Sequence, residues 1–218
     1  MLNKDQKIGI CIIITILGYL LYGIFGDHNP DIKINIADRT FLIPQKYISK
    51  NPEGWDTDSQ LLEFMLPDFT ASYIGSGSIK DRSRVLIADE STKADLDDLH
   101  EIRRERAPKI EYLKSKYGLE SELWYNNKKG EIIPYNEVHI KKDSKGSIVN
   151  YITCSTLKRG THIKFPSCRS VFFKDGLYYS LTFNKEKYLS KWDEFNQKTV
   201  TFLESFEVTK EDYDNASK

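Results

Sequence analysis

The sequence predicts an α+β fold, in which an antiparallel sheet packs against two amphipathic helices, preceded by one transmembrane helix. Three observations lead to this prediction. Residues 8 to 26 carry no charged side chain, residues 122 to 183 contain runs rich in aromatic and β-branched side chains, and residues 185 to 206 repeat apolar side chains at three- and four-residue steps. These patterns are typical of a membrane span, of strands and of a helix with one apolar face.

The uncharged segment Ile8–Gly26 is long enough to cross a bilayer. Its nineteen residues would span about 28 Å as a helix, close to the roughly 30 Å of hydrocarbon in a membrane. Lys4 and Lys7 precede it, whereas Asp27 and Asp31 follow it, so the positive-inside rule keeps the amino terminus in the cytoplasm and exports the rest. The alternative is a cleaved signal peptide, but the run exceeds the usual apolar core and lacks an A-x-A cleavage pattern.

The remainder of the chain has the composition of one exported globular domain. We expect a cytoplasmic stub and anchor at 1–26, a spacer at 27–39, a periplasmic α+β domain at 40–208 and a polar tail at 209–218. Basic and acidic residues balance at 32 each. This balance argues against nucleic acid as a partner, because nucleic-acid-binding proteins show a basic excess or stripe. The prediction is a single-pass protein of a bacterial inner membrane with its domain in the periplasm.

The first strong helical pattern covers residues 92–117. Ser91 or Thr92 is the expected amino-terminal cap, and acids precede arginines along the segment in the order that complements the helix dipole. Pro108 is expected to kink this element or to divide it into two helices, because proline removes a backbone donor and clashes with the preceding turn. Gly118 is expected to cap its carboxyl end.

Between Glu122 and Phe183 the sequence predicts an antiparallel meander of about four or five strands. Asp175 and Gly176 stand between two aromatic runs and give the strongest hairpin signal in the chain. A second amphipathic helix is then expected from Lys185 to Phe206, with Asn184 as its cap. Its aromatic stripe is expected to pack on the sheet rather than to bind a ligand.

The two cysteines of the exported domain, Cys154 and Cys168, predict a disulfide. An oxidising compartment favours this bond, and the C-x-x-C spacing of metal or redox pairs is absent. The loop between them carries four candidate partner-binding residues, Lys158, Arg159, His162 and Lys164. Ordering a segment with fixed ends costs less entropy on binding than ordering a free one. The alternative is that these four are simply solvated.

Motifs that carry catalysis are missing from the sequence. It contains no HExxH pair, no G-x-S-x-G elbow, no Walker loop and no G-x-G-x-x-G segment. The histidines are scattered and are expected on the surface: His28, His100, His139 and His162. Three acids of the first helical region, Asp97, Asp98 and Glu101, are expected to be solvated. We therefore expect no enzymatic activity, no catalytic residue, no cofactor and no metal.

Several short features follow one another in a recognisable order. After the anchor come Phe41-Leu42-Ile43-Pro44-x-x-Tyr47, a two-cysteine loop ending in Pro166-Ser167-Cys168, an aromatic hairpin and a final helix with Leu189-x-x-Trp192. This order resembles small membrane-anchored periplasmic proteins of Gram-negative bacteria. Some of these are similar to immunity proteins encoded beside type VI secretion effectors, which bind and block a toxin delivered to the periplasm. The resemblance implies a protein partner and transfers no catalytic residue.

Two classes of function remain open at this point. The first is a protein-binding module that meets a toxin or an envelope protein, confined to the membrane surface by the anchor Ile8–Gly26, which raises its effective concentration there. The second is an envelope enzyme or ligand-binding domain whose site is assembled from dispersed residues and leaves no motif in the sequence.

Overall fold

The computed structural model describes four parts of the chain, residues 31–49, 59–72, 81–156 and 166–209. The expected anchor Ile8–Gly26 and most of the expected tail lie outside these ranges. Within them, no helix is long and apolar enough to cross a membrane. A compact unit begins at Ile32, so it starts inside the expected spacer at 27–39. Asp31–Ile36 forms a strand there, and Ile36 is buried in the core.

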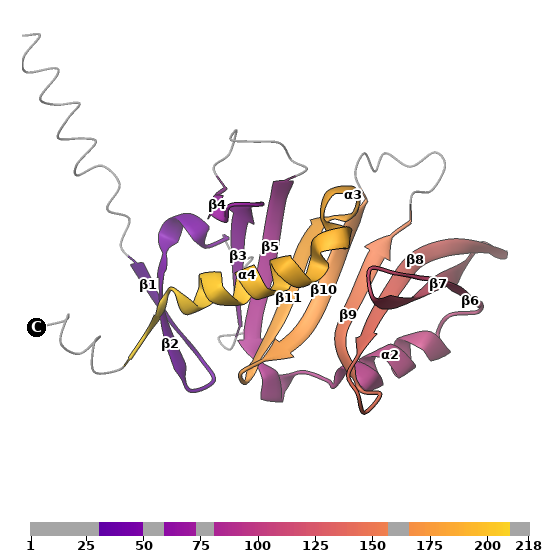
Figure 1. Cartoon of the computed structure of the whole chain (residues 1–218), viewed down its shortest axis with the longest axis horizontal. Coiled ribbons are helices and arrows are strands. Elements are labelled where there is room, and N and C mark those ends of the chain that lie inside the picture. The colour runs from indigo at the N-terminus through magenta and orange to yellow at the C-terminus, as the bar shows by residue number, and fades with distance from the viewer. Residues whose placement is uncertain (1–30, 50–58, 73–80, 157–165, 210–218) are drawn as a thin grey trace, which may run out of the picture. The chain divides into compact units, whose positions relative to one another are not determined.

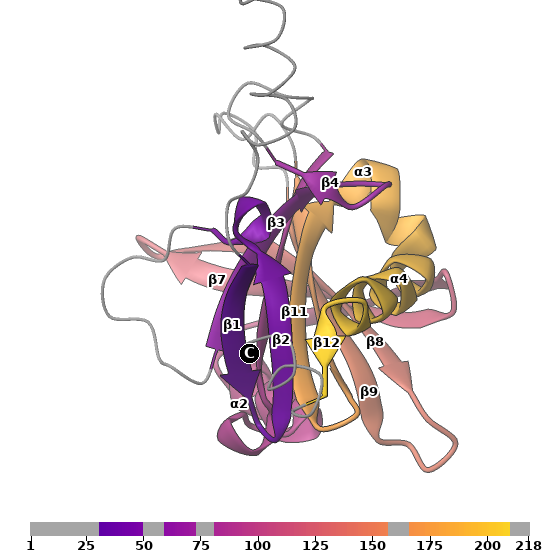
Figure 2. The ribbon, with the colours of Figure 1, turned by 90° about the vertical axis from the view of Figure 1, so that its left-hand side faces the viewer.

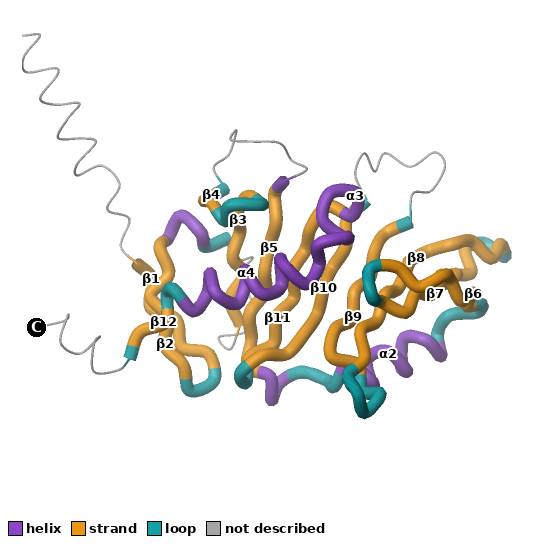
Figure 3. The backbone as a smooth tube through the Cα atoms, viewed as in Figure 1, coloured by secondary structure: helices purple, strands orange, loops and turns teal. Residues whose placement is uncertain are grey.

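A nine-stranded antiparallel sheet dominates this unit (Figure 3), with the strand order β4-β3-β5-β11-β10-β9-β8-β7-β6. The six strands from β6 to β11 form an uninterrupted meander, and β5 pairs with β11 at its end. The bounds are β3 (Ser59–Met65), β4 (Thr70–Ala71), β5 (Arg82–Asp89), β6 (Ile110–Lys116), β7 (Leu119–Lys128), β8 (Glu131–Lys142), β9 (Ile148–Ser155), β10 (Ser167–Lys174) and β11 (Leu177–Asn184).

Among the described residues, a smaller sheet and three α-helices complete the unit. The three-stranded sheet has the order β1-β2-β12, and Figure 2 shows it beside the carboxyl end of α4. Its strands are β1 (Asp31–Ile36), β2 (Arg39–Pro44) and β12 (Glu207–Val208). The helices are α2 (Leu96–Glu105), α3 (Lys185–Tyr188) and α4 (Trp192–Glu204), and single 3-10 turns are η1 (Gln45–Tyr47), η3 (Glu90–Thr92) and η4 (Leu189–Lys191).

The predicted helix at 92–117 is wrong in its second half. Helix α2 ends at Glu105, and residues 110–116 form strand β6 instead. Pro108 stops the helix, and the residues after it pair with β7 as an antiparallel edge strand that is mostly exposed. Tyr117 and Gly118 both have positive φ, at 55° and 74°, which is the geometry of a two-residue hairpin turn. Gly118 is therefore a turn glycine and not a helix cap.

The cap of α2 also differs from the prediction. Asp95 accepts a hydrogen bond from the backbone N–H of Asp97 at 2.7 Å and is the amino-terminal cap. Ser91 and Thr92 lie in the preceding 3-10 turn, which Asp89 caps. Asp97 is not simply solvated, because its carboxylate accepts a hydrogen bond from the backbone N–H of Ile148. This contact ties the first turn of α2 to strand β9.

The carboxyl-terminal helix is confirmed with an interruption. Asn184 caps it as predicted, accepting from the backbone N–H of Lys187 at 3.1 Å. The 3-10 turn Leu189–Lys191 then separates α3 from α4. In Figure 1, α4 crosses in front of β11 and β10, and its apolar stripe packs on the sheet as expected. The Asp175-Gly176 hairpin between β10 and β11 is confirmed as well.

Alternation along the strands creates two cores, one on each face of the large sheet. The α4-side core joins the sheet to α4 and the small sheet, and its members include Ile36, Phe41, Leu62, Phe64, Ile87, Tyr179, Phe183, Phe195 and Leu203. The α2-side core is smaller and consists of Ala88, Leu96, Trp124, Val138, Ile140, Ile148, Tyr151, Val171 and Tyr178. The two faces therefore differ in how much apolar surface they bury.

Candidate functional site

A pocket of about 380 Å³ opens where α2 ends against β7 and β8. We call it the arginine–aromatic pocket, and its walls are Arg103, Arg106, Ala107, Trp124, Tyr125, Asn126, Tyr135 and Asn136. The pocket combines two guanidinium groups, three aromatic rings and two carboxamides. Tryptophan, tyrosine and arginine are the residue types that dominate the binding energy of protein–protein interfaces.

Local backbone features place the pocket's side chains. In the β7–β8 pairing Trp124 lies opposite Asn136 and Tyr125 opposite Pro134, so Tyr135 is an extra residue in β8. Such a bulge bends a strand and turns a side chain in a new direction. Tyr135 is 49% exposed and lines the pocket. The bulge thus adds an aromatic side chain to the wall that a regular strand would not supply there.

The guanidinium groups of the pocket lack acidic partners among the residues that the structure describes. Arg103 lies over the ring of Tyr151, with its guanidinium carbon 5.7 Å from the ring centre. Arg106 caps the carboxyl end of α2 and is exposed. No described carboxylate forms an ion pair with either side chain. The pocket therefore presents positive charge that a carboxylate of another molecule can neutralise.

Exposed apolar side chains gather around this end of the molecule. Of the eight large apolar side chains that are exposed in the described parts of the chain, six belong to α2, β6, β8 or the β6–β7 turn: Ile102, Tyr112, Leu113, Tyr117, Ile132 and Tyr135. Tyr112 is 71% exposed and accepts a hydrogen bond from Arg104. Clusters of exposed apolar groups mark interaction surfaces more often than single ones do.

A buried polar network supports the pocket from below. Glu122 accepts hydrogen bonds from the indole N–H of Trp124 at 2.6 Å and from His100 at 3.2 Å. Burial alone would raise the pKa of Glu122, but these hydrogen bonds together hold that pKa below its ordinary value. The expectation that His100 lies on the surface is wrong, because its side chain points from α2 towards Trp124 and Tyr151 and is only 13% exposed. The network fixes Trp124, whose ring forms part of the pocket wall.

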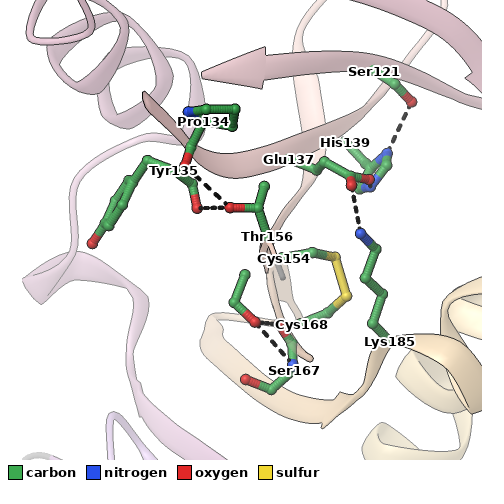
Figure 4. A network of polar contacts seen from close by, with 11 residues as sticks. Ser121, Pro134, Tyr135, Glu137, His139, Cys154, Thr156, Ser167, Cys168 and Lys185 are labelled. Atoms are coloured by element: carbon green, nitrogen blue, oxygen red, sulfur yellow. Dashed lines mark hydrogen bonds and ion pairs between the residues drawn. A yellow bond between two sulfur atoms is a disulfide. The ribbon is translucent and has the colours of Figure 1, made fainter. Parts of the chain in front are cut away.

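A second polar network lies beside the disulfide (Figure 4). A 2.8 Å hydrogen bond joins Ser121 Oγ and His139 Nδ1, and Glu137 accepts from Lys185 Nζ at 2.6 Å. His139 is only 2% exposed, so the prediction of a surface histidine is wrong here too. Burial lowers the pKa of His139 to about 4, and its ring is neutral near pH 7.

The contact between Ser121 and His139 has the residue types of a catalytic pair, since hydrolases combine a serine with a histidine. Ser121 is 4% exposed and His139 is 2% exposed. A substrate has no access to either side chain in this conformation. The contact instead gives two buried polar groups a partner, which is the ordinary reason for such pairs. Among the described residues, no group of three or more possible ligands is arranged to hold a metal ion.

The predicted disulfide is present. Cys154 and Cys168 face each other in the β9–β10 pairing, and their sulfur atoms are bonded. Next to it, Thr156 donates a hydrogen bond to the carbonyl oxygen of Tyr135 at 2.9 Å (Figure 4). The four predicted binding residues, Lys158, Arg159, His162 and Lys164, lie outside the described residues. The described base of their loop nevertheless contacts Tyr135, which lines the arginine–aromatic pocket.

Sequence reasoning missed the arginine–aromatic pocket for a topological reason. Arg103 and Arg106 come from α2, Trp124 from β7 and Tyr135 from β8, so no short motif contains them. The arginines stand where helices usually carry basic residues, and the sequence gives no reason to single them out. Their meeting depends on α2 ending at Glu105, which the longer predicted helix concealed.

Comparison with solved structures identifies a related fold. Smlt3025, an immunity protein of the Stenotrophomonas maltophilia type IV secretion system, is 13% identical, with a TM-score of 0.57 over 83% of this chain and 94% of that chain. The Neisseria meningitidis iron-regulated outer membrane lipoprotein FrpD is 11% identical, with a TM-score of 0.48 over 82% and 92%. No family model and no curated protein matches this sequence. At these identities the likeness to Smlt3025 shows a shared fold.

Proposed function

We propose that this protein is a protein-binding module of the bacterial envelope that binds and blocks a secreted toxin. The anchor Ile8–Gly26 holds it on the inner membrane, with its α+β domain in the periplasm. We propose that a type VI secretion system delivers this toxin. The structural neighbour Smlt3025 is an immunity protein of a type IV secretion system. In this proposal the protein acts by binding alone and uses no cofactor.

The observation that carries the proposal is the arginine–aromatic pocket with its two arginines that have no described acidic partner. Arginine presents a planar fork that binds a carboxylate through two parallel hydrogen bonds. Tyr135 and Trp124 supply apolar surface on rigid side chains beside that charge. This combination fits an aspartate or glutamate side chain of a partner protein that is flanked by apolar residues. The fold shared with an immunity protein supports the same conclusion.

The pocket's surroundings favour a protein partner over a small molecule. At about 380 Å³ the pocket accepts one or two side chains, and exposed apolar residues such as Ile102 and Tyr112 extend the contact area beyond it. Protein interfaces combine a few deeply placed anchors with a wider rim. The pocket is therefore the proposed centre of the interface, and the exposed surface of α2, β6 and β8 is its proposed rim.

The direct test is a protection assay. A secreted toxin encoded beside this gene would be produced in the periplasm of a bacterial host together with the full-length chain or with Arg106→Glu. The wild-type chain is expected to restore growth and to copurify with the toxin, and Arg106→Glu is expected to do neither. Lys145→Glu is the matched control, because Lys145 is exposed in the β8–β9 turn and its side chain has no described partner.

Two outcomes would contradict the proposal. If Arg106→Glu and Lys145→Glu both protect as well as the wild type, the pocket is not the binding site. If the purified full-length chain hydrolyses phospholipid or peptidoglycan, binding alone does not account for its action. Membrane fractionation tests the location separately, since a soluble periplasmic product beginning near Asp27 would establish cleavage of the anchor.

A further inference from the structure

The large sheet ends in an open edge at strand β6. Among the described strands, β6 pairs only with β7, and Figure 3 shows it at the outer end of the sheet. The strand at the other end, β4, has two residues, whereas β6 has seven. An edge strand presents backbone N–H and C=O groups that can pair with a strand of another chain. β6 is therefore the longer of the two edges at which the sheet can be extended.

The pairing with β7 shows which backbone groups of β6 face the open edge. The backbone N–H of Tyr125 in β7 donates to the carbonyl oxygen of Lys109 at 3.0 Å, and the register is regular from Ile110 to Leu113. In an antiparallel pair, the backbone groups of successive residues point alternately towards the neighbouring strand and away from it. Lys109 faces β7, as do the odd-numbered residues after it. Ile110 and Tyr112 therefore direct both their N–H and their C=O groups to the open edge.

The two ends of β6 are protected against pairing, and its middle is not. Pro108 precedes the strand, Lys114 and Lys116 end it, and the register shifts between Leu113 and Lys116. Proline, lysine and bulges are the features with which natural sheets block their edges. Residues 110–113 carry none of them and pair regularly with β7. An added strand is thereby limited to this short segment.

Apolar side chains accompany the free backbone groups. Ile110 packs against the α2-side core. Tyr112 is 71% exposed, and its hydroxyl accepts a hydrogen bond from Arg104, which holds the ring beside the edge. Side chains directly opposite each other on neighbouring strands lie in contact. An added strand would therefore place a side chain against Tyr112, and an apolar, β-branched one suits both the ring and the strand.

The charges near the edge favour an acidic occupant. Glu111 is already paired with Lys109, whereas Lys114 and Lys116 form no ion pair with any carboxylate that the structure describes. A second copy of β6 would bring two more lysines to this edge. Acidic side chains on an added strand would instead neutralise the two lysines, and this complementarity distinguishes one partner from another.

We propose that β6 binds an extended acidic segment of another protein as an additional strand of the large sheet. The backbone of that segment exchanges hydrogen bonds with Ile110 and Tyr112, one of its apolar side chains rests against Tyr112, and its carboxylates lie beside Lys114 and Lys116. The site is the sheet edge and not the arginine–aromatic pocket. It does not depend on the proposed toxin partner, and either proposal can fail alone.

The test uses the isotope-labelled full-length chain in detergent and the probe acetyl-glutamyl-valyl-glutamyl-valyl-glutamyl-valine amide. NMR measures hydrogen exchange at each amide with and without the probe. The N–H groups of Ile110 and Tyr112 are expected to exchange roughly tenfold more slowly when the probe is bound, because the added strand accepts their hydrogen bonds. Those of Glu111 and Leu113 already bond to β7 and are expected to change less than about twofold. Unchanged exchange at Ile110 and Tyr112 would overturn the proposal.

A proline at the edge gives a second test. Tyr112→Pro removes an N–H that points away from β7, and proline is tolerated at such positions of edge strands. It is expected to weaken probe binding by roughly tenfold, since one hydrogen bond is lost and the ring obstructs the added strand. Tyr112→Val is the matched control, because it keeps the N–H and is expected to bind more tightly than the proline variant. Equal binding by the two variants, with thermal unfolding showing both folded, would contradict strand addition.

The choice of occupant is tested separately. A probe in which every glutamate is replaced by lysine is expected to bind the wild-type chain at least about fivefold more weakly, because it meets Lys114 and Lys116 with like charge. Equal binding of the two probes would overturn the acidic occupant. Exchange at Ile110 and Tyr112 that slows in the chain alone as its concentration rises would show that a second copy covers the edge, and it would overturn the proposal as well.

Discussion

The two faces of the large sheet differ in what they bury. On the face covered by α4 and the small sheet, aromatic and aliphatic side chains fill a continuous core, and Phe41, Phe64 and Phe195 are almost completely buried. On the α2 face a smaller apolar cluster lies beside the polar side chains of Glu122 and His100. The comparison indicates that the α4 side supplies most of the stability, while the α2 side uses buried polar groups to position the wall of the arginine–aromatic pocket.

Truncating the two cores should give the largest difference. Phe195→Ala on α4 is expected to lower the free energy of unfolding by about 4 kcal/mol, through lost apolar burial and the cavity left behind. Leu99→Ala on α2 removes a side chain that is only partly buried, and it is expected to cost less than about 2 kcal/mol. Urea unfolding measures both. Equal losses would contradict the assignment of stability to the α4 side.

Removing the disulfide should come next in size. Cys154→Ala combined with Cys168→Ala is expected to lower the free energy of unfolding by about 3 kcal/mol, because the unfolded chain gains freedom when the loop is opened. The loss should disappear when wild-type protein is compared under reducing conditions. A mass spectrum of a non-reduced digest showing two free thiols in the native protein would refute the bond itself.

His139 should make stability depend on pH. Its pKa is about 4 in the folded protein, because burial disfavours the charged ring, and about 6.5 in the unfolded chain. The unfolded chain therefore binds the extra proton between these values. Stability is fully present above about pH 6.5 and falls as the pH drops towards 4, by up to about 3 kcal/mol. Urea unfolding across this range should show the fall, and His139→Gln should flatten it.

A change in the α2-side network should have a smaller effect. Glu122→Gln weakens two charge-assisted hydrogen bonds, from His100 and Trp124, and is expected to lower the free energy of unfolding by about 2 kcal/mol. Glu120→Gln is the control on the same strand, since Glu120 forms an ion pair with Lys142 at the surface and such pairs contribute less than about 1 kcal/mol. Similar losses for both would remove the structural role assigned to the network.

The sequence predicted the parts of the fold that local chemistry determines. Asn184 as a cap, the Asp175-Gly176 hairpin and the Cys154–Cys168 pair depend on neighbouring residues or on compartment, and the structure contains all three. The extent of α2 could not be read locally, because Ile110–Lys116 satisfies both a helical and a strand pattern. Pairing with β7 decides between them, and this pairing depends on contacts between two strands rather than on the pattern within one segment.

The candidate site shows the same limit more strongly. Arg106 and Tyr135 meet through the end of a helix and a bulge, and neither feature follows from spacing. His139 is buried because β8 turns that side chain inwards, which the scattered histidines of the sequence do not reveal. The predicted loop residues Lys158, Arg159, His162 and Lys164 remain a prediction, and the contact between Thr156 and Tyr135 links the base of their loop to the pocket.

The central claim is that the α2 face binds the partner. The most direct test is the dissociation constant of the toxin for the full-length chain, measured for wild type, Arg106→Glu and Lys145→Glu. The account predicts that Arg106→Glu weakens binding by roughly 30-fold or more, as expected for an anchor residue at an interface, while Lys145→Glu changes it less than about threefold. Equal effects of the two reversals, or an unchanged constant for Arg106→Glu, would contradict the claim.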